Sequence, residues 1–140
     1  MTPLSLVPPS PALAVGRSVR ATATERARAL PGDEQIPDAI DTLTHGITIR
    51  RAPRDVWPWL VQMGAGSRGG WYSYDWLDNF GRRSPTTLTP GLERLAVGQP
   101  VMRIFRIASF VPERHLTLAL PPGAGERLFG RVAVTYRVVA

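Results

Sequence analysis

The chain has 140 residues, of which 44% are hydrophobic and 20% charged, and its formal net charge is +6. No run of about 18 apolar residues occurs, which excludes a membrane-spanning helix, and the lack of cysteine excludes disulfides, thiolate nucleophiles and cysteine-ligated zinc. All 17 basic residues are arginine, so a Schiff-base lysine and a P-loop lysine are excluded as well. The composition predicts a cytoplasmic protein with one globular domain.

The positive charge is spread along the chain. The only adjacent basic pairs are Arg50–Arg51 and Arg82–Arg83, and no basic helix with interleaved aromatic residues is present. Nucleic acid is therefore not an expected partner.

Residues 1–30 are expected to be a disordered or loosely packed N-terminal segment, because they are rich in Pro, Ala and Leu without a usable period. Within them, Ser18–Leu30 favours a short helix with Ser18 as its N-cap. The folded domain is expected over residues 31–140, and it begins with the extended stretch PGDEQIPDA.

The first clear strand is predicted at Leu43–Arg51, where apolar and polar residues alternate. A helix is predicted from Asp55 to Met63, with Pro58 as a possible kink, and a second from Tyr74 to about Asn79, capped by Ser73. The predicted strand places these residues on one face: Leu43, His45, Ile47 and Ile49.

Three further strands are predicted, at Pro100–Ile107, Arg114–Leu120 and Arg131–Val139. Consecutive strands favour an antiparallel sheet, so the expected class is α+β, with two short helices between the first and second strands. Trp57, Leu60, Trp76 and Leu77 form the apolar stripes of these helices and are expected to be largely buried.

Four stretches, LPGDEQIPDA, IRRAPRDVWPWLVQMGAGSRGGWYSYDWLDN, LAVGQP and FVPERHLTLAL, together resemble the SRPBCC superfamily, the START-like group of polyketide cyclases/dehydrases and lipid-transport proteins. VWPWLVQMG followed by GWYSYDWLDN is similar to a bacterial branch of mostly unassigned function. The resemblance implies a helix-grip fold, in which a curved sheet and two short helices enclose a cavity. It also implies further strands and a long C-terminal helix beyond Ala140, so the domain is expected to be truncated.

The implied cavity directs attention to aromatic and polar residues near its mouth. Aromatic side chains line ligand pockets, but they also plug hydrophobic cores. An inward histidine or arginine could bind a polar group of a ligand, or could simply reach water. The candidate ligand-binding residues are His45, Trp71, Tyr72, Tyr74, Trp76, Arg103 and Phe105.

The expected function is the binding of a hydrophobic or aromatic small molecule, without a cofactor or a metal. Asp75 and Asp78 are spaced to form a carboxylate pair, although Asp75 also suits a helix N-terminus. Two alternatives stay open: a cyclase/dehydratase-type enzyme acting on a polyketide-like substrate through residues such as His45, Tyr72 or Tyr74, and an interaction protein. The latter would self-associate through an uncovered sheet face, unless Ser18–Leu30 folds back as a lid. That face comprises Val132, Val134, Tyr136 and Val138.

Overall fold

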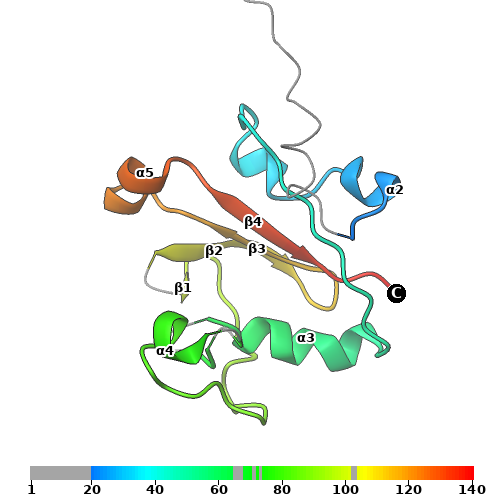
Figure 1. Cartoon of the computed structure of the whole chain (residues 1–140), viewed down its shortest axis with the longest axis vertical. Helices are drawn as coiled ribbons and strands as arrows, with labels where there is room; N and C mark the ends of the chain where they lie inside the picture. Colours follow the sequence, from blue (N-terminus) through cyan, green and yellow to red (C-terminus); the bar gives the residue numbers. More distant parts are fainter. Residues whose placement is uncertain (1–19, 65–67, 71, 73, 102–103) are drawn as a thin grey trace, which may run out of the picture. The chain divides into compact units, whose positions relative to one another are not determined.

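The structure, a computed structural model, describes residues 20–64, 68–70, 72, 74–101 and 104–140. It divides into two units, Met1–Ala29 with Asp38–Ile49, and Leu30–Pro37 with Arg50–Ala140. All the strands of the described residues belong to the second unit (Figure 1).

One four-stranded antiparallel sheet forms the centre of the second unit. Its strands, in the order in which they pair, are β1 (Pro100–Val101), β2 (Phe105–Val111), β3 (His115–Ala119) and β4 (Ala133–Arg137). Leu118 pairs with Ile107 on one side and with Val134 on the other. The α+β class and the antiparallel sheet are confirmed.

The predicted strand Pro100–Ile107 is interrupted. Val101 pairs with Phe105, so the chain reverses inside this apolar run and divides it between β1 and β2. A run of bulky apolar residues indicates that a segment is buried, but it does not indicate where the chain reverses. The sequence pattern therefore could not show this reversal.

The prediction of a strand at Leu43–Arg51 is wrong, because residues 41–49 adopt no regular secondary structure. Leu43, Ile47 and Ile49 are exposed. Alternation identifies two faces, but a strand also needs a neighbour for its backbone hydrogen bonds, and the described part of the first unit contains none. Consequently the two helices that were expected between the first and second strands precede every strand of the described residues.

The helices are short. They are α2 (Ala23–Arg26), the 3₁₀ helix η1 (Asp33–Gln35), α3 (Pro53–Gln62), α4 (Asp75–Asp78) and α5 (Ala124–Phe129). The helix predicted at Asp55–Met63 is confirmed as α3, which continues through Pro58. In α2 the N-cap is Thr22, which forms a capping box with Glu25, and the predicted cap Ser18 lies outside the described residues. Helix α5 was not predicted.

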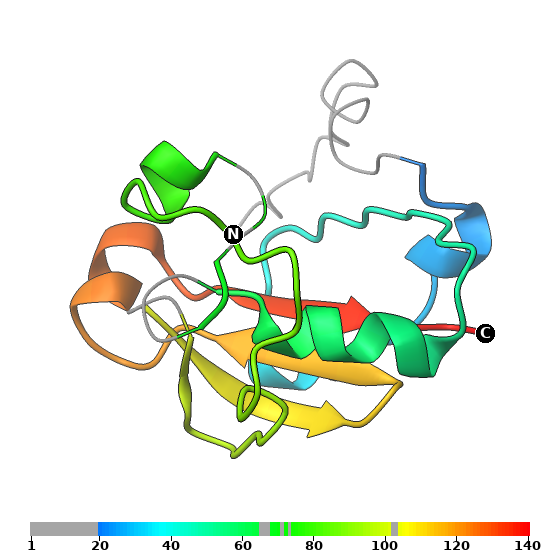
Figure 2. The ribbon, with the colours of Figure 1, turned by 90° about the horizontal axis from the view of Figure 1, so that it is seen from below.

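The core lies between α3 and one face of the sheet. Val101, Ile107, Leu116 and Leu118 are buried there, and Trp57 and Leu60 of α3 pack against them while remaining half-buried. Figure 2 shows α3 beside the sheet, running roughly along the direction of β3 and β4. The prediction that Trp76 and Leu77 are buried is wrong, because they are 74% and 59% exposed.

The opposite face of the sheet is polar and is covered by the segment Leu30–Pro37. Thr117 is fully buried, and its Oγ1 lies 3.0 Å from Oγ1 of Thr135. A Cβ on Gly32 would lie only 2.7 Å from the same Thr135 hydroxyl, and Arg131 donates to the carbonyl oxygen of Gln35 at 3.1 Å. The stretch LPGDEQIP is therefore a packing layer, which is why a residue without a side chain is needed at position 32.

The sheet face that was expected to lack cover is half-buried. All four of its residues have intermediate exposure, and Tyr136 packs against the core. Burial raises the pKa of the Tyr136 hydroxyl. These residues are Val132, Val134, Tyr136 and Val138.

Candidate functional site

A pocket with a volume of about 280 Å³ lies beyond the C-terminal end of α3. It is formed by the turn that contains Arg68 and by the segment that follows α4. The residues that line it are Arg68, Gly69, Asn79, Arg82, Arg83, Pro85, Thr89 and Leu92.

The glycine-rich loop after α3 places one wall of the pocket. Gly64 and Gly70 exchange two backbone hydrogen bonds, of 2.9 and 2.8 Å, so the two ends of the loop lie side by side. Gly70 has φ +104°, and a Cβ there would lie 2.5 Å from Oγ of Ser84. Glycine is required at this position because the backbone conformation and the close approach both exclude a side chain.

Arg68 lies inside this loop and is directed inward. It is 7% exposed, and its Nη2 donates to the carbonyl oxygens of Val61 and of Leu92, the latter at 2.8 Å. Burial lowers the pKa of the Arg68 guanidinium, but arginine stays protonated in proteins. Its Nε and Nη1 groups donate to no other described residue, so this buried cation retains hydrogen-bonding capacity at the pocket wall.

The opposite wall is held in place by α4. Ser84 donates to the Asp75 carboxylate from its hydroxyl at 2.5 Å and from its backbone N–H at 3.0 Å. These two hydrogen bonds, assisted by the nearby positive charge of Arg83, hold the pKa of the Asp75 carboxyl below its usual range. Asn79, which is 5% exposed, donates to the carbonyl oxygen of Arg82 at 2.7 Å.

Gln62 connects α3 to the two loops. It is 1% exposed, and its amide donates to the Tyr72 hydroxyl and to the carbonyl oxygen of Thr87, the latter at 3.4 Å. Its Oε1 accepts the backbone N–H of Thr89 at 2.9 Å. Tyr72 also meets the ring of Trp59 edge-on, with 6.1 Å between ring centroids. The pocket therefore has a frame fixed by buried polar contacts.

The lining is positively charged. Three of its eight residues are arginines and none is acidic, while Asp75, the neighbouring carboxylate, is already bonded to Ser84. Guanidinium groups bind carboxylates and phosphates through charge-assisted hydrogen bonds. The pocket is thus suited to an anionic group, with Pro85 and Leu92 supplying apolar surface.

The structure does not bring the residues proposed from the sequence together in this pocket. Tyr72 helps to frame it through Gln62, whereas Tyr74 and Trp76 are 70% and 74% exposed and do not line it. Phe105 packs against the core, and His45 is exposed in the first unit. Trp71 and Arg103 lie outside the described residues.

The sequence reasoning missed Arg68, Asn79, Arg82 and Arg83. A signal was present, because Arg68 is the one charged residue within GAGSRGG and Arg82–Arg83 is one of two arginine doublets. Arginines in isolated positions are common on surfaces, however, and only the tertiary structure shows these three around one pocket.

Among the described residues, no group of three or more His, Asp or Glu side chains could hold a metal ion, and no helix is long and apolar enough to cross a membrane. Comparison with family models, with curated proteins and with solved structures gives no significant match for this chain. The similarity to the SRPBCC superfamily therefore remains a prediction from the sequence.

Proposed function

We propose that this chain binds a small molecule that has an acidic group and a hydrophobic or aromatic body. The observation that carries the proposal is the buried guanidinium of Arg68 at the wall of a pocket that Arg82 and Arg83 also line. The resemblance to the SRPBCC superfamily supports small-molecule binding in general, and the pocket specifies the charge.

The argument rests on the cost of burying a cation. A guanidinium removed from water needs hydrogen-bond acceptors and benefits from an opposite charge. Two backbone carbonyls satisfy part of Arg68, and a ligand carboxylate or phosphate would satisfy more of it while adding the missing charge. Hydrogen bonds to charged groups contribute about 1.5–3 kcal/mol each.

The size of the pocket limits the ligand. Its volume of about 280 Å³ is near the lower end of the range of about 300–1,000 Å³ that is typical of ligand pockets. A single aromatic or short aliphatic body with one acidic group fits this volume better than a long lipid chain.

Binding is favoured over catalysis by the chemistry of the lining. Its side chains are those of Arg, Asn, Pro, Thr and Leu, besides glycine, and none of these is a usual general acid or base near neutral pH. The cyclase/dehydratase alternative would need a residue such as Tyr72, whose hydroxyl already accepts from Gln62.

The proposal is tested by titration calorimetry with 1-naphthoate, with its neutral amide and with inorganic phosphate. We expect naphthoate to bind more tightly than the amide, and Arg83→Gln to weaken naphthoate binding by about 2–10-fold, because Arg83 is a partly solvated contact. Arg68→Gln should weaken it by at least about tenfold.

The matched control is Arg127→Gln, which makes the same charge change at an exposed position on α5, away from the pocket. Because Arg68 also bonds the backbone, a folding defect in Arg68→Gln would leave Arg83→Gln as the deciding variant. Equal affinity for the acid and the amide, or an equal loss in Arg127→Gln and Arg83→Gln, would contradict the proposal.

A further inference from the structure

Helix α4 differs from an ordinary surface helix in which of its side chains face solvent. Asp75 of α4 and the C-cap residue Asn79 are turned toward the protein, since Asp75 is bonded to Ser84 and Asn79 is 5% exposed. The apolar residues of α4 and of the positions that flank it are exposed to the following extents: Tyr74 70%, Trp76 74%, Leu77 59% and Phe80 68%. A helix on the surface of a globular domain normally does the reverse.

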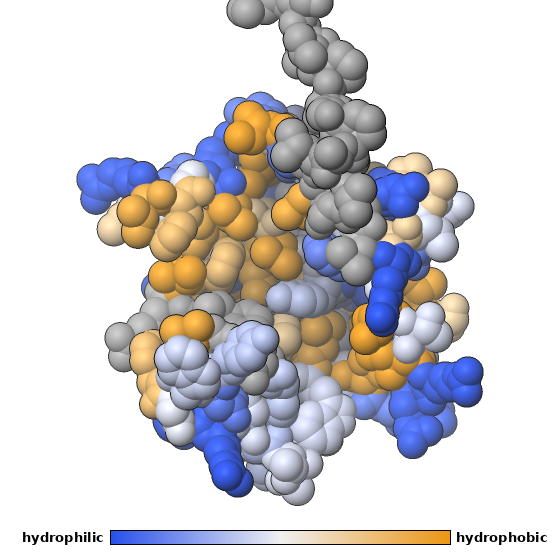
Figure 3. Space-filling model, viewed as in Figure 1, coloured by the Kyte–Doolittle hydropathy of each residue, from blue (hydrophilic) through white to orange (hydrophobic). Residues whose placement is uncertain are grey.

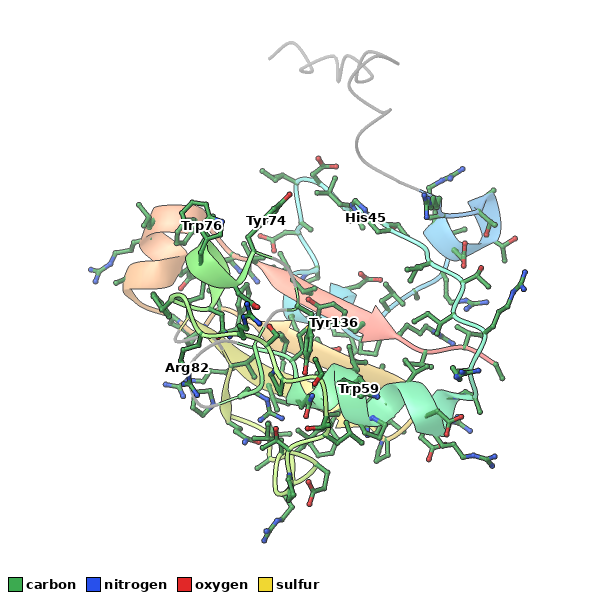
Figure 4. The ribbon with its side chains drawn as sticks, turned by 60° about the horizontal axis from the view of Figure 1, so that its bottom comes forward. His45, Trp59, Tyr74, Trp76, Arg82 and Tyr136 are labelled. Atoms are coloured by element: carbon green, nitrogen blue, oxygen red, sulfur yellow. The ribbon has the colours of Figure 1, made fainter. Side chains whose placement is uncertain are left out.

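The four exposed side chains form one surface, here called the α4 face. Trp76 and Leu77 lie within α4, Tyr74 is its N-cap residue and Phe80 directly follows its C-cap residue Asn79, so all four belong to one short segment. Figure 4 shows Tyr74 and Trp76 on the same side of α4, with Arg82 on the other side. Figure 3 shows near-neutral to apolar residues over this region, at the lower left.

We propose that the α4 face docks the chain on the surface of a lipid bilayer with anionic headgroups. Trp and Tyr rings suit the boundary between headgroups and acyl chains, because one end is apolar and the other can meet water. A short apolar face can enter this boundary to a depth of about 5–10 Å without spanning the membrane. The polar side of α4 would stay bonded to Ser84 and to Arg82, as it is in the structure.

The size of the face favours a bilayer over a protein partner. A stable protein interface uses about 20–30 residues on each side, whereas the α4 face consists of four residues close together in the sequence. Membrane docking needs fewer contacts, because apolar burial is supplemented by the attraction between basic groups and the charged surface.

The charge of the chain is complementary to such a surface. The net charge is +6, and the exposed Arg82 and Arg83 follow the α4 face directly. Arginine side chains are long, so these two could reach headgroups around the docked face. This attraction falls off over about 10 Å at moderate salt.

The test is co-sedimentation of the full chain with vesicles of phosphatidylcholine alone and of phosphatidylcholine with about 30% phosphatidylglycerol. We expect binding to the anionic vesicles that weakens with salt. The double variant Trp76→Ser/Phe80→Ser should bind at least about tenfold more weakly, because the variant removes two of the inserted side chains.

The matched control is Leu128→Ser/Phe129→Ser on α5, which also replaces two exposed apolar side chains, 75% and 60% exposed. It should retain binding. An equal loss in both double variants, or equal binding to the neutral and anionic vesicles, would overturn the proposal. So would light scattering that shows an oligomer which only the α4 variant dissociates, because the occupant would then be a second copy of the chain.

Docking and ligand binding can fail independently. Arg68→Gln should leave sedimentation with vesicles unchanged, and Trp76→Ser/Phe80→Ser should leave naphthoate binding unchanged. Circular dichroism melting of each variant verifies that it is folded before either measurement.

Discussion

At the scale of single residues, Gln62 shows how a buried amide can organise a site. Its side chain makes hydrogen bonds with Tyr72, Thr87 and Thr89, all outside its own helix. A buried polar group is favourable only while its partners are present, because each unpaired donor or acceptor retains its desolvation cost.

We therefore expect Gln62→Leu to lower the free energy of unfolding by about 1–3 kcal/mol, since the N–H of Thr89 loses its acceptor. Urea denaturation measures this change. Gln35→Leu, at an exposed position whose backbone carbonyl alone is used, should change stability by less than about 0.5 kcal/mol. If the two variants behave alike, Gln62 does not hold the loops together.

The lowered pKa of Asp75 predicts that the stability of the protein depends on pH. Its pKa is lowered in the folded state by the hydroxyl and the backbone N–H of Ser84, so its stabilising effect is present above the ordinary carboxyl pKa and is lost as the pH falls through the lowered folded value. In Ser84→Ala the pKa should rise toward about 3.9, and stability should fall less steeply with acid. Carboxyl NMR titration and denaturation below about pH 4 check both effects.

Asp75→Asn supplies the control, because it removes the titrating group. This variant should abolish the part of the acid sensitivity that Ser84→Ala reduces. A Ser84→Ala protein with the same Asp75 titration as the wild type would contradict the assignment.

At the scale of elements, α3 and α4 have opposite relations to the core. Helix α3 packs its apolar side on the sheet, whereas α4 is attached through Asp75 and Asn79 and leaves its aromatic residues outside. Both segments contain aromatic residues, so their composition alone does not predict which helix contributes to the core.

Trp57→Ala and Trp76→Ala form a matched pair for this difference. A fully buried Trp costs about 3–5 kcal/mol when truncated, and half-buried Trp57 should cost somewhat less. Trp76→Ala should change stability by less than about 0.5 kcal/mol. Denaturant unfolding compares them, and similar costs would mean that α4 packs like α3.

The packing of the segment Leu30–Pro37 against β4 is tested by a double-mutant cycle. Gly32→Ala should cost about 1–3 kcal/mol, because its Cβ would lie 2.7 Å from the Thr135 hydroxyl. The cost should be smaller in a Thr135→Ala background, where the nearest atom of residue 135 would be the Cβ at 3.7 Å. An unchanged cost in that background would show that position 32 does not touch β4 in solution.

At the scale of the whole molecule, the hydrophobic core cluster belongs to one unit. Every residue of the core cluster lies in Arg50–Ala140. We thus expect a chain without residues 1–29 to unfold with a free energy within about 0.5 kcal/mol of the full chain. Urea denaturation and binding of a hydrophobic dye measure this, and a marked loss of stability with new dye binding would show instead that Ser18–Leu30 covers the sheet.

The sequence by itself determined the elements whose signals are local. Pro53 in the first turn and the apolar stripe of Trp57, Leu60 and Val61 predict α3 without reference to the rest of the chain. The alternation in Arg114–Leu120 and Arg131–Val139 likewise predicts β3 and β4, because a strand with one buried face carries its period in its own residues.

Only the tertiary structure decided which segments find partners. Residues 43–51 alternate as well as β3 does, yet they form no strand, because a strand exists through hydrogen bonds to a neighbour. The pocket depends in the same way on contacts between distant residues, such as Arg68 with Leu92 and Gln62 with Thr89. These pairings are 24 and 27 residues apart in the chain, and no local period encodes them.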